Sequence, residues 1–245
     1  MRKKIMIAGF AGALLVILAL ITGLSNIGPI IESAVNTYGP DLTKTEVRLD
    51  DVSVSLLSGT ARLSGFLLGS PDGFDAPHVM QVGAITMSID KGSLTEDMIV
   101  VDEIVIEQPE IVYERSGGRD NFTAILANIE QSLGLERAAE PVEEQSPRTM
   151  LVRRFAVKDG KVKLAMSLGK DMTISVPLPD IEMENIGGEK ASPGEVSREL
   201  LSSIYKQIST PDVMGALNSG LKNIGEGAKK GMEAAKDKVK GLFGR

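Results

Sequence analysis

Residues 52–68, VSVSLLSGTARLSGFLL, decide how this chain folds, because they have the pattern of a β-hairpin. At residues 52–56 apolar and polar side chains alternate, which is typical of a strand with one face against a core. Ser58-Gly59 is a turn signal, and residues 61–68 are predicted to form the returning strand. The stretch therefore predicts an antiparallel β-sheet with one apolar face, arranged as a groove or half-sandwich.

More strands are predicted towards the C-terminus. Strand patterns occupy residues 82–89 and 99–106, and Pro109 breaks the second run before it continues at 111–113. A second β portion repeats the order of strand, glycine turn and strand, with its turn expected at residues 158–161. Its strands are expected at residues 155–157, 162–166, 172–176 and 181–186. The whole predicts a mainly β protein (α+β), with one sheet extended by similar hairpins and with flanking helices.

One helix is predicted between the two β portions. Asp120 or Asn121 is its expected N-cap, and Gly134 its expected end. Residues 138–147 are acidic, contain proline and lack an apolar period, so they are expected to form a linker or exposed loop. The apolar residues that share one helical face are Phe122, Ile125, Leu126, Ile129 and Leu133.

An uncharged apolar run near the N-terminus predicts a membrane anchor. Residues 5–24 carry no charge, and as a helix rising about 1.5 Å per residue they would cross the roughly 30 Å of a bilayer's hydrocarbon. The preceding Arg2-Lys3-Lys4 favours a cytoplasmic N-terminus and a translocated body. A signal peptide cleaved near Gly23-Leu24-Ser25 is the alternative. Helical spacing continues through Tyr38, until Gly39-Pro40 is expected to stop it, and this length favours the uncleaved anchor.

The C-terminal region is predicted to form two amphipathic helices separated by Pro211. The first spans about residues 196–208, and the second carries an apolar stripe at helical steps over residues 213–242. Lysines on its other face suit anionic headgroups at a membrane surface, while packing of the stripe on the protein's own sheet or on a partner is the alternative. The candidate membrane-surface residues are Lys222, Lys229, Lys230, Lys236, Lys238 and Lys240.

Composition argues against nucleic acid, metals and catalysis. The net charge is −6, and the basic residues gather at the two ends, so the body between them lacks the basic face that nucleic acid requires. Cysteine is absent, and the single histidine, His78, excludes any two-histidine metal site. No nucleophile motif such as G-x-S-x-G accompanies it. We therefore expect a protein that is not an enzyme and that needs neither cofactor nor metal.

The order of these segments resembles a known family. The resemblance rests on the apolar anchor, residues 47–63, the loop 69–74, the strand run 104–114, and Asn121-Phe122 before a short helix. Over about residues 5–135 the chain resembles the N-terminal region of AsmA-like envelope proteins of Gram-negative bacteria, especially their short, single-span members. The resemblance implies a β-groove of the bridge-like lipid-transfer type, anchored in the inner membrane and projecting into the periplasm. It also implies a role in phospholipid transport and in outer-membrane or envelope integrity.

Three regions are expected on this basis. Residues 1–38 would form a cytoplasmic stub, the transmembrane anchor and its helical extension. Residues 39–190 would form the periplasmic β domain, and residues 191–245 an amphipathic helical tail.

Two hypotheses about function remain open. In the first, an apolar groove in the sheet holds phospholipid, although the inward residues of an ordinary β core would show the same pattern. In the second, the protein is a non-enzymatic scaffold or assembly factor that binds an envelope protein or a second copy through the C-terminal helix or a sheet edge. The candidate groove-lining residues are Val52, Val54, Leu56, Leu63, Ile85, Met87, Ile104, Ile106, Ile174 and Val176.

Overall fold

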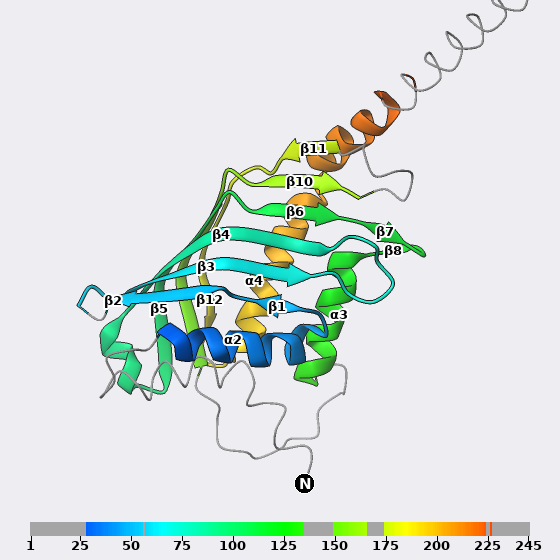
Figure 1. The fold of residues 1–245 in the computed structure, drawn as a ribbon. Coiled ribbons are helices and arrows are strands. Elements are labelled where there is room, and N and C mark those ends of the chain that lie inside the picture. The colour runs from blue at the N-terminus through cyan, green and yellow to red at the C-terminus, as the bar shows by residue number, and fades with distance from the viewer. Residues whose placement is uncertain (1–27, 56, 135–148, 166–173, 224–225, 227–245) are drawn as a thin grey trace, which may run out of the picture.

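A curled, ten-stranded β-sheet with helices packed along it forms the body of the protein (Figure 1). The computed structural model describes residues 28–55, 57–134, 149–165, 174–223 and 226. Over these residues the protein is mainly β with flanking helices, as the sequence predicts. None of the described helices is long and apolar enough to cross a membrane. The predicted anchor at 5–24, the linker at 138–147 and residue Met172 lie outside the described residues.

The elements follow the predicted order closely. The strands of the large sheet are β1 (Val47–Arg48), β2 (Asp51–Ser55), β3 (Thr60–Gly69), β4 (His78–Ile89), β5 (Met98–Glu107), β6 (Glu110–Tyr113), β9 (Thr149–Lys158), β10 (Lys161–Leu164), β11 (Ile174–Pro177) and β12 (Ile181–Gly188). A small hairpin consists of β7 (Arg115–Ser116) and β8 (Arg119–Asp120). The helices are α2 (Gly28–Thr43), the 3-10 helix η1 (Lys91–Thr95), α3 (Asn121–Leu133) and α4 (Pro193–Ile208), and residues 211–223 are also helical.

Several of the short strands join end to end into longer ones. β5 and β6 pair with β4 in one register, because Ala84 lies opposite Glu107 and Gln81 opposite Glu110. β10 continues β9 along β6 and β5 in the same way, and β11 leads into β12. The predicted hairpin turn at residues 158–161 is therefore wrong. β9 and β10 do not fold back on each other but follow one another along the same neighbours.

The long strands are interrupted or, at Gly65 within β3, kinked along one line of the sheet, which we call the crease: residues 49–50, 65, 108–109, 159–160 and 178–180. Gly65, Gln108 and Asp159 have positive φ angles of 66°, 51° and 53°, and such residues kink a strand in the manner of a β-bulge. Hydrogen bonding continues across the line. The amide of Gln108 donates to the carbonyl of Lys158 at 2.8 Å, and the amide of Leu178 donates to the carbonyl of Gly160 at 2.8 Å. The sheet thus bends without losing its ladder.

The sheet is mixed, whereas the sequence predicts an antiparallel sheet. Its order is β11-β10-β6-β4-β5-β9-β12, with β3 on the free side of β4 and β1 and β2 on β3. β5 pairs with β9, and β6 with β10, in parallel. The reason is α3, which joins β8 to β9 as a crossover, so that the chain starts its next long strand from the same end.

The prediction for α3 is confirmed at both ends. The side chain of Asp120 accepts a hydrogen bond from the amide of Thr123 at 2.8 Å, and Gly134 ends the helix with a left-handed φ of 72°. The apolar face that the sequence predicts is directed into the core, because Phe122 and Ile125 are fully buried and Ile129 is almost so.

The predicted stop of α2 at Gly39-Pro40 is wrong, since the helix continues to Thr43. Pro40 removes one helical hydrogen bond, but the last turn is held on the sheet by packing. Leu42 is buried, and a Cβ at Gly39 would lie 2.7 Å from the Cβ of Val47. Tertiary contact therefore outweighs the local helix-breaking signal.

The C-terminal helices pack on the body. Ser192 caps α4, whose Val196, Ile204 and Ile208 are buried. Pro211 breaks the helix as predicted, and the next helix begins there. Val213 and Leu217 of that next helix are buried. The first part of the predicted second amphipathic helix thus packs its apolar side chains on the body of the protein.

Candidate functional site

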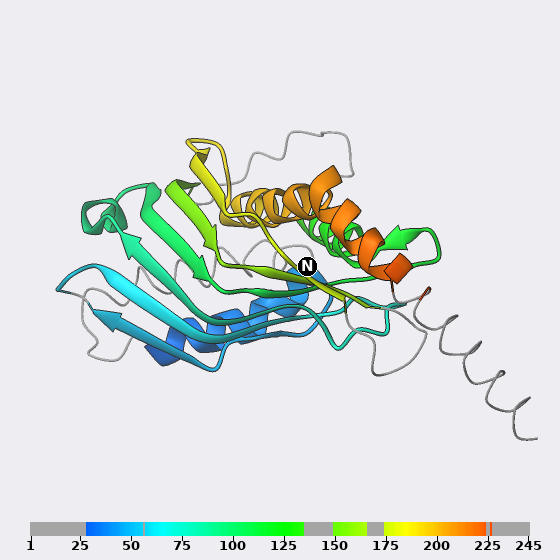
Figure 2. The same ribbon diagram turned by 90° about the horizontal axis from the view of Figure 1, so that it is seen from above.

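The sheet has an inner face, which we define as the face that carries α2, α3 and α4. Figure 2 shows the curl of the sheet, with α3 and α4 lying along one side of it. One apolar cluster contains inner-face residues of the strands together with Phe122 of α3 and Ile204 of α4. The inner face is thus the place where the predicted groove must be sought.

Two apolar rows cross this face between the crease and the β2–β3 turn. Neighbouring strands place them in register, so each residue lies opposite the next. The first row is Val52, Leu63, Ile85, Ile106, Val157 and Ile181, and the second is Val54, Ala61, Met87, Ile104, Phe155 and Met183. We call the two rows together the apolar strip.

The structure brings seven of the ten predicted lining residues into the apolar strip. Ile174 and Val176 instead lie beyond the crease, in β11. Val176 there ends a separate buried row that contains Met80, Ile111 and Val162. Leu56 lies outside the described residues. The seven residues in the strip are Val52, Val54, Leu63, Ile85, Met87, Ile104 and Ile106.

The sequence hypothesis missed Ala61 and the third of the strip that β9 and β12 supply. Phe155 and Val157 are each 1% exposed and join the strip residues of β5 to those of β12. Their neighbours Ile181 and Met183 complete the rows at β12. The alternation of apolar and polar residues at 181–186 indicates that β12 has an apolar face. Only the parallel pairing of β5 with β9 shows that this face continues the apolar rows of the first β portion.

Helices cover the flanks of the strip more than its middle. α2 packs on β1 and β2, with Ile31 and Val35 in the same apolar cluster as Val52, and α4 packs on β9 and β12. On the middle strands Leu63 and Met87 are partly exposed, whereas Ile85 is 9% exposed. Val54 and Met183 on the flanking strands are also partly exposed, while Ile104 and Ile106 are buried, so the strip is a largely packed surface with accessible apolar side chains along its length.

The opposite face of the same strands is charged. Arg153 forms an ion pair with Asp102, and Arg154 Nη1 lies 2.5 Å from Glu103 Oε1. A hydrogen bond to Glu182, reinforced by the charge of Glu103, raises the pKa of Arg154. These pairs link β5, β9 and β12 on the outside of the sheet, which leaves the inner face as its apolar side.

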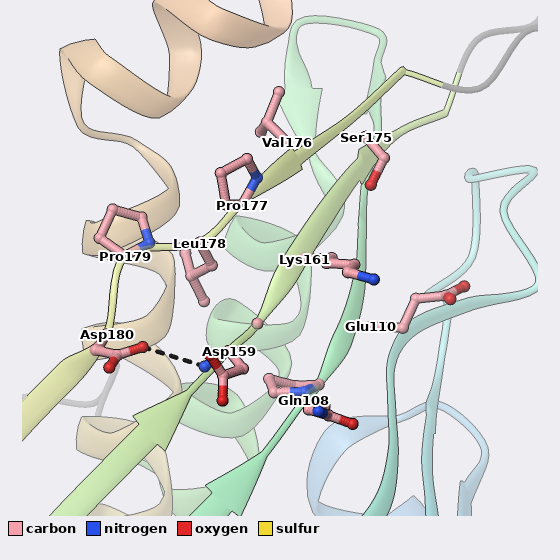
Figure 3. Close-up of a pocket in the computed structure, with 12 residues that line it drawn as sticks. Gln108, Glu110, Asp159, Lys161, Ser175, Val176, Pro177, Leu178, Pro179 and Asp180 are labelled. Atoms are coloured by element: carbon pink, nitrogen blue, oxygen red, sulfur yellow. Dashed lines mark hydrogen bonds between the residues drawn. The ribbon is translucent and has the colours of Figure 1, made fainter.

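A separate cleft of about 790 Å³ lies at the crease (Figure 3). Glu110, Lys161 and Ser175 project from neighbouring strands there, and the Asp180 carboxylate accepts a hydrogen bond from the Asp159 amide at 3.1 Å. The cleft is on the outer face, because the residue after Lys161 points into the core. Its mixed charges do not match the predicted apolar groove.

Two tyrosines, Tyr113 at the end of β6 and Tyr205 in α4, lie near Asp120 at the start of α3, away from the strip. The Tyr205 hydroxyl donates to Asp120 at 3.0 Å, and its ring stacks on Phe122 with centroids 5.8 Å apart. Burial, together with the negative charge of Asp120, raises the pKa of Tyr113 to about 12. Burial and the bond to Asp120 raise the pKa of Tyr205 as well. Both phenols are thus neutral and structural at physiological pH.

No group of three or more metal-ligating side chains occurs among the residues that the structure describes. His78 lies at the start of β4, with Nε2 3.8 Å from Glu110 Oε1. This Nε2 is buried and forms no hydrogen bond with another residue of the described part of the chain.

Of the six predicted membrane-surface lysines, one lies among the residues that the structure describes. Lys222 is exposed near the end of the 211–223 helix. The other five, Lys229, Lys230, Lys236, Lys238 and Lys240, lie outside the part of the chain that the structure describes, so their role stays a prediction.

Comparison with known proteins gives one family. No curated protein and no solved structure matches the chain. A family model described as the AsmA family matches residues 1–186. The match runs from the apolar N-terminal segment through the whole apolar strip and ends within β12, so it extends beyond the region of the initial resemblance. The chain belongs to the AsmA family.

Proposed function

We propose that this protein handles phospholipid in the bacterial envelope by holding acyl chains against the apolar strip. Membership of the AsmA family is consistent with an envelope-related role in lipid handling. The observation that carries the proposal is the partial exposure of Leu63 and Met87 in the middle of a continuous apolar surface. The protein acts as a binding module, without a catalytic step and without a cofactor.

The physical reason is the removal of hydrocarbon from water. Apolar surface that leaves water contributes about 25 cal/mol per Å², and a strip that crosses six strands offers an elongated path for an acyl chain. Neighbouring strands are about 4.8 Å apart, so a path across six of them is roughly 24 Å long. This length suits an extended acyl chain better than it suits a compact ligand.

The N-terminal segment supports a place at the inner membrane. Residues 5–24 form an uncharged run behind Arg2-Lys3-Lys4, a pattern that favours a single span with a cytoplasmic N-terminus. The body would then project into the periplasm, close to the outer surface of that membrane. Phospholipid is available there, and the protein would contribute to lipid transport and to outer-membrane integrity.

Uptake of a fluorescent phospholipid by the purified protein tests this proposal. Met87→Glu places a charge in the strip and should lower uptake by about tenfold or more, because a carboxylate does not leave water readily. Thr86→Glu is the matched control. Thr86 is the neighbouring residue, exposed on the opposite face of β4, and the substitution should leave uptake unchanged. Wild-type protein that contains no co-purified lipid and takes up none would refute lipid handling.

A scaffolding role is the second candidate, favoured by the free edge of the sheet. β12 ends the sheet order and pairs with β9 alone among the described strands, so its other edge is open to a partner strand. The C-terminal tail is the other candidate contact. Its deletion should start after residue 226, because Val213 and Leu217 belong to the core of the body. Loss of a co-purified envelope protein after that truncation, with an unchanged melting temperature, would favour the scaffold.

A further inference from the structure

The turn between β2 and β3 carries the one large apolar side chain that is exposed among the described residues. Leu57 is 92% exposed, at the tip of a hairpin. A single exposed leucine is common on soluble proteins and needs no explanation by itself. The hydrogen bonds of the surrounding backbone and the position of the tip in the fold distinguish this leucine from an ordinary exposed one.

The backbone around Leu57 is hydrogen-bonded within the protein. Lys91 Nζ donates to the Leu57 carbonyl at 2.7 Å. The Gly59 amide donates to the Ser55 carbonyl, and the Ile89 amide donates to the Gly59 carbonyl, each at 2.9 Å. Transfer of an unpaired peptide group out of water is costly. A tip with internally paired peptide groups therefore enters an apolar medium more readily than an open loop does.

The tip lies at the end of the molecule where the chain arrives from the predicted anchor. A Cβ at Gly28, the first residue of α2, would lie 2.0 Å from the Val52 carbonyl oxygen, so the helix starts on β2. From Val52, β2 continues to Ser55, about 10 Å at 3.3 Å per residue, and Leu57 lies in the turn that follows. Figure 1 shows the dark blue start of α2 and the β2–β3 turn at one end of the sheet, with β7 and β8 at the other. The predicted span ends at Leu24, close before Gly28 in the sequence.

We propose that the β2–β3 tip is a second membrane contact, in which Leu57 inserts into the phospholipid surface of the bilayer that holds residues 5–24. The contact rests on the anchoring part of the proposed function. One leucine binds a free protein to a membrane only weakly, but a tethered tip meets the surface at high effective concentration. The second row of the apolar strip begins at Val54, next to the tip, so the contact would bring that end of the strip to the bilayer.

Tryptophan fluorescence tests the contact directly, because the chain contains no tryptophan. The full-length protein is reconstituted in phosphatidylcholine nanodiscs with ordinary or with brominated acyl chains, which quench tryptophan on contact. Three single-tryptophan variants are compared. Leu57→Trp reports on the tip, Ser116→Trp on an exposed hairpin at the opposite end of the sheet, and Met87→Trp on the strip.

The proposal predicts a loss of emission for Leu57→Trp in brominated discs and no loss for Ser116→Trp. Unchanged emission of Leu57→Trp would overturn the contact, and so would an equal loss at both sites, because the body would then lie on the bilayer without orientation. Met87→Trp separates the two proposals. If Leu57→Trp alone is quenched, the tip contact stands and phospholipid in the strip does not.

Discussion

At the scale of single residues, the crease depends on backbone conformations that few side chains tolerate. Gly65 has a φ of 66°, and a Cβ there would lie 2.1 Å from Asp50 Oδ2. Both the left-handed backbone and the close approach of the Asp50 side chain therefore require glycine at this position. The bend of the sheet at β3 is encoded in this pair of residues more than in any apolar pattern.

Gly65→Ala should destabilise the protein more than Gly73→Ala does. Gly73 also has a positive φ, 90°, but no atom would lie within 4 Å of an added Cβ. The control should lose about 1–2 kcal/mol for the left-handed backbone alone, and Gly65→Ala should add the displacement of Asp50. Chemical denaturation of both variants measures the difference, and equal losses would show that the close approach has no energetic weight.

Tyr113 makes the stability of the fold sensitive to alkaline pH. Its pKa is about 12 in the folded protein against 10.0 for the free side chain, so the unfolded chain releases this proton first. The contribution of the neutral phenol is fully present below pH 10 and is lost as pH rises from about 10 to about 12. Melting temperatures over this range should fall more steeply for the wild type than for Tyr113→Phe. Parallel curves would contradict the shifted pKa.

At the scale of elements, the 211–223 helix decides where the body ends. The sequence alone allows its apolar stripe to contact a membrane surface, a partner or the protein's own sheet. The structure assigns its first part to the sheet, because Leu217 is 1% exposed and a Cβ at Gly220 would lie 2.6 Å from Ile174 Cγ2. β11, a strand at the end of the sheet order, is thereby covered by the tail.

Leu217→Ala should lower the free energy of unfolding by about 2–5 kcal/mol, the usual cost of a cavity in a packed core. Asn218→Ala changes the next residue, which is exposed, and should stay within about 0.5 kcal/mol of the wild type. Urea denaturation of the pair provides the comparison. A Leu217→Ala variant as stable as the control would mean that the helix is detached from the body in solution.

At the scale of the whole molecule, the sequence predicts the elements better than it predicts their connections. Local signals were sufficient for the strands from 52 to 106, the break at Pro109 and the cap of α3 at Asp120, because alternation, proline and capping act within a few residues. The turn expected at Asp159-Gly160 proved to be a kink in one long strand. A glycine after an aspartate has the same local pattern in a hairpin and in a crease, and only pairing with distant β5 and β6 separates the two.

The candidate site was predictable to the same extent. Alternation identified the strip residues of β2 to β5 apart from Ala61, since they face one side of hairpins that are close in sequence. It did not identify Phe155 and Met183 as their neighbours, because parallel pairing through the α3 crossover leaves no local mark. Nor did it show which residues the helices cover, which is the property that separates Met87 from a fully buried core residue.

Site-specific photo-crosslinking to phospholipid in the living cell tests the central claim, that the apolar strip holds lipid, most directly. A photoreactive benzoylphenylalanine replaces Met87 in one variant and Thr86, on the opposite face of the same strand, in the other. Lipid handling by the strip predicts crosslinked phospholipid at position 87 and none at position 86. Absence of lipid at 87, or equal labelling of both positions, would contradict it.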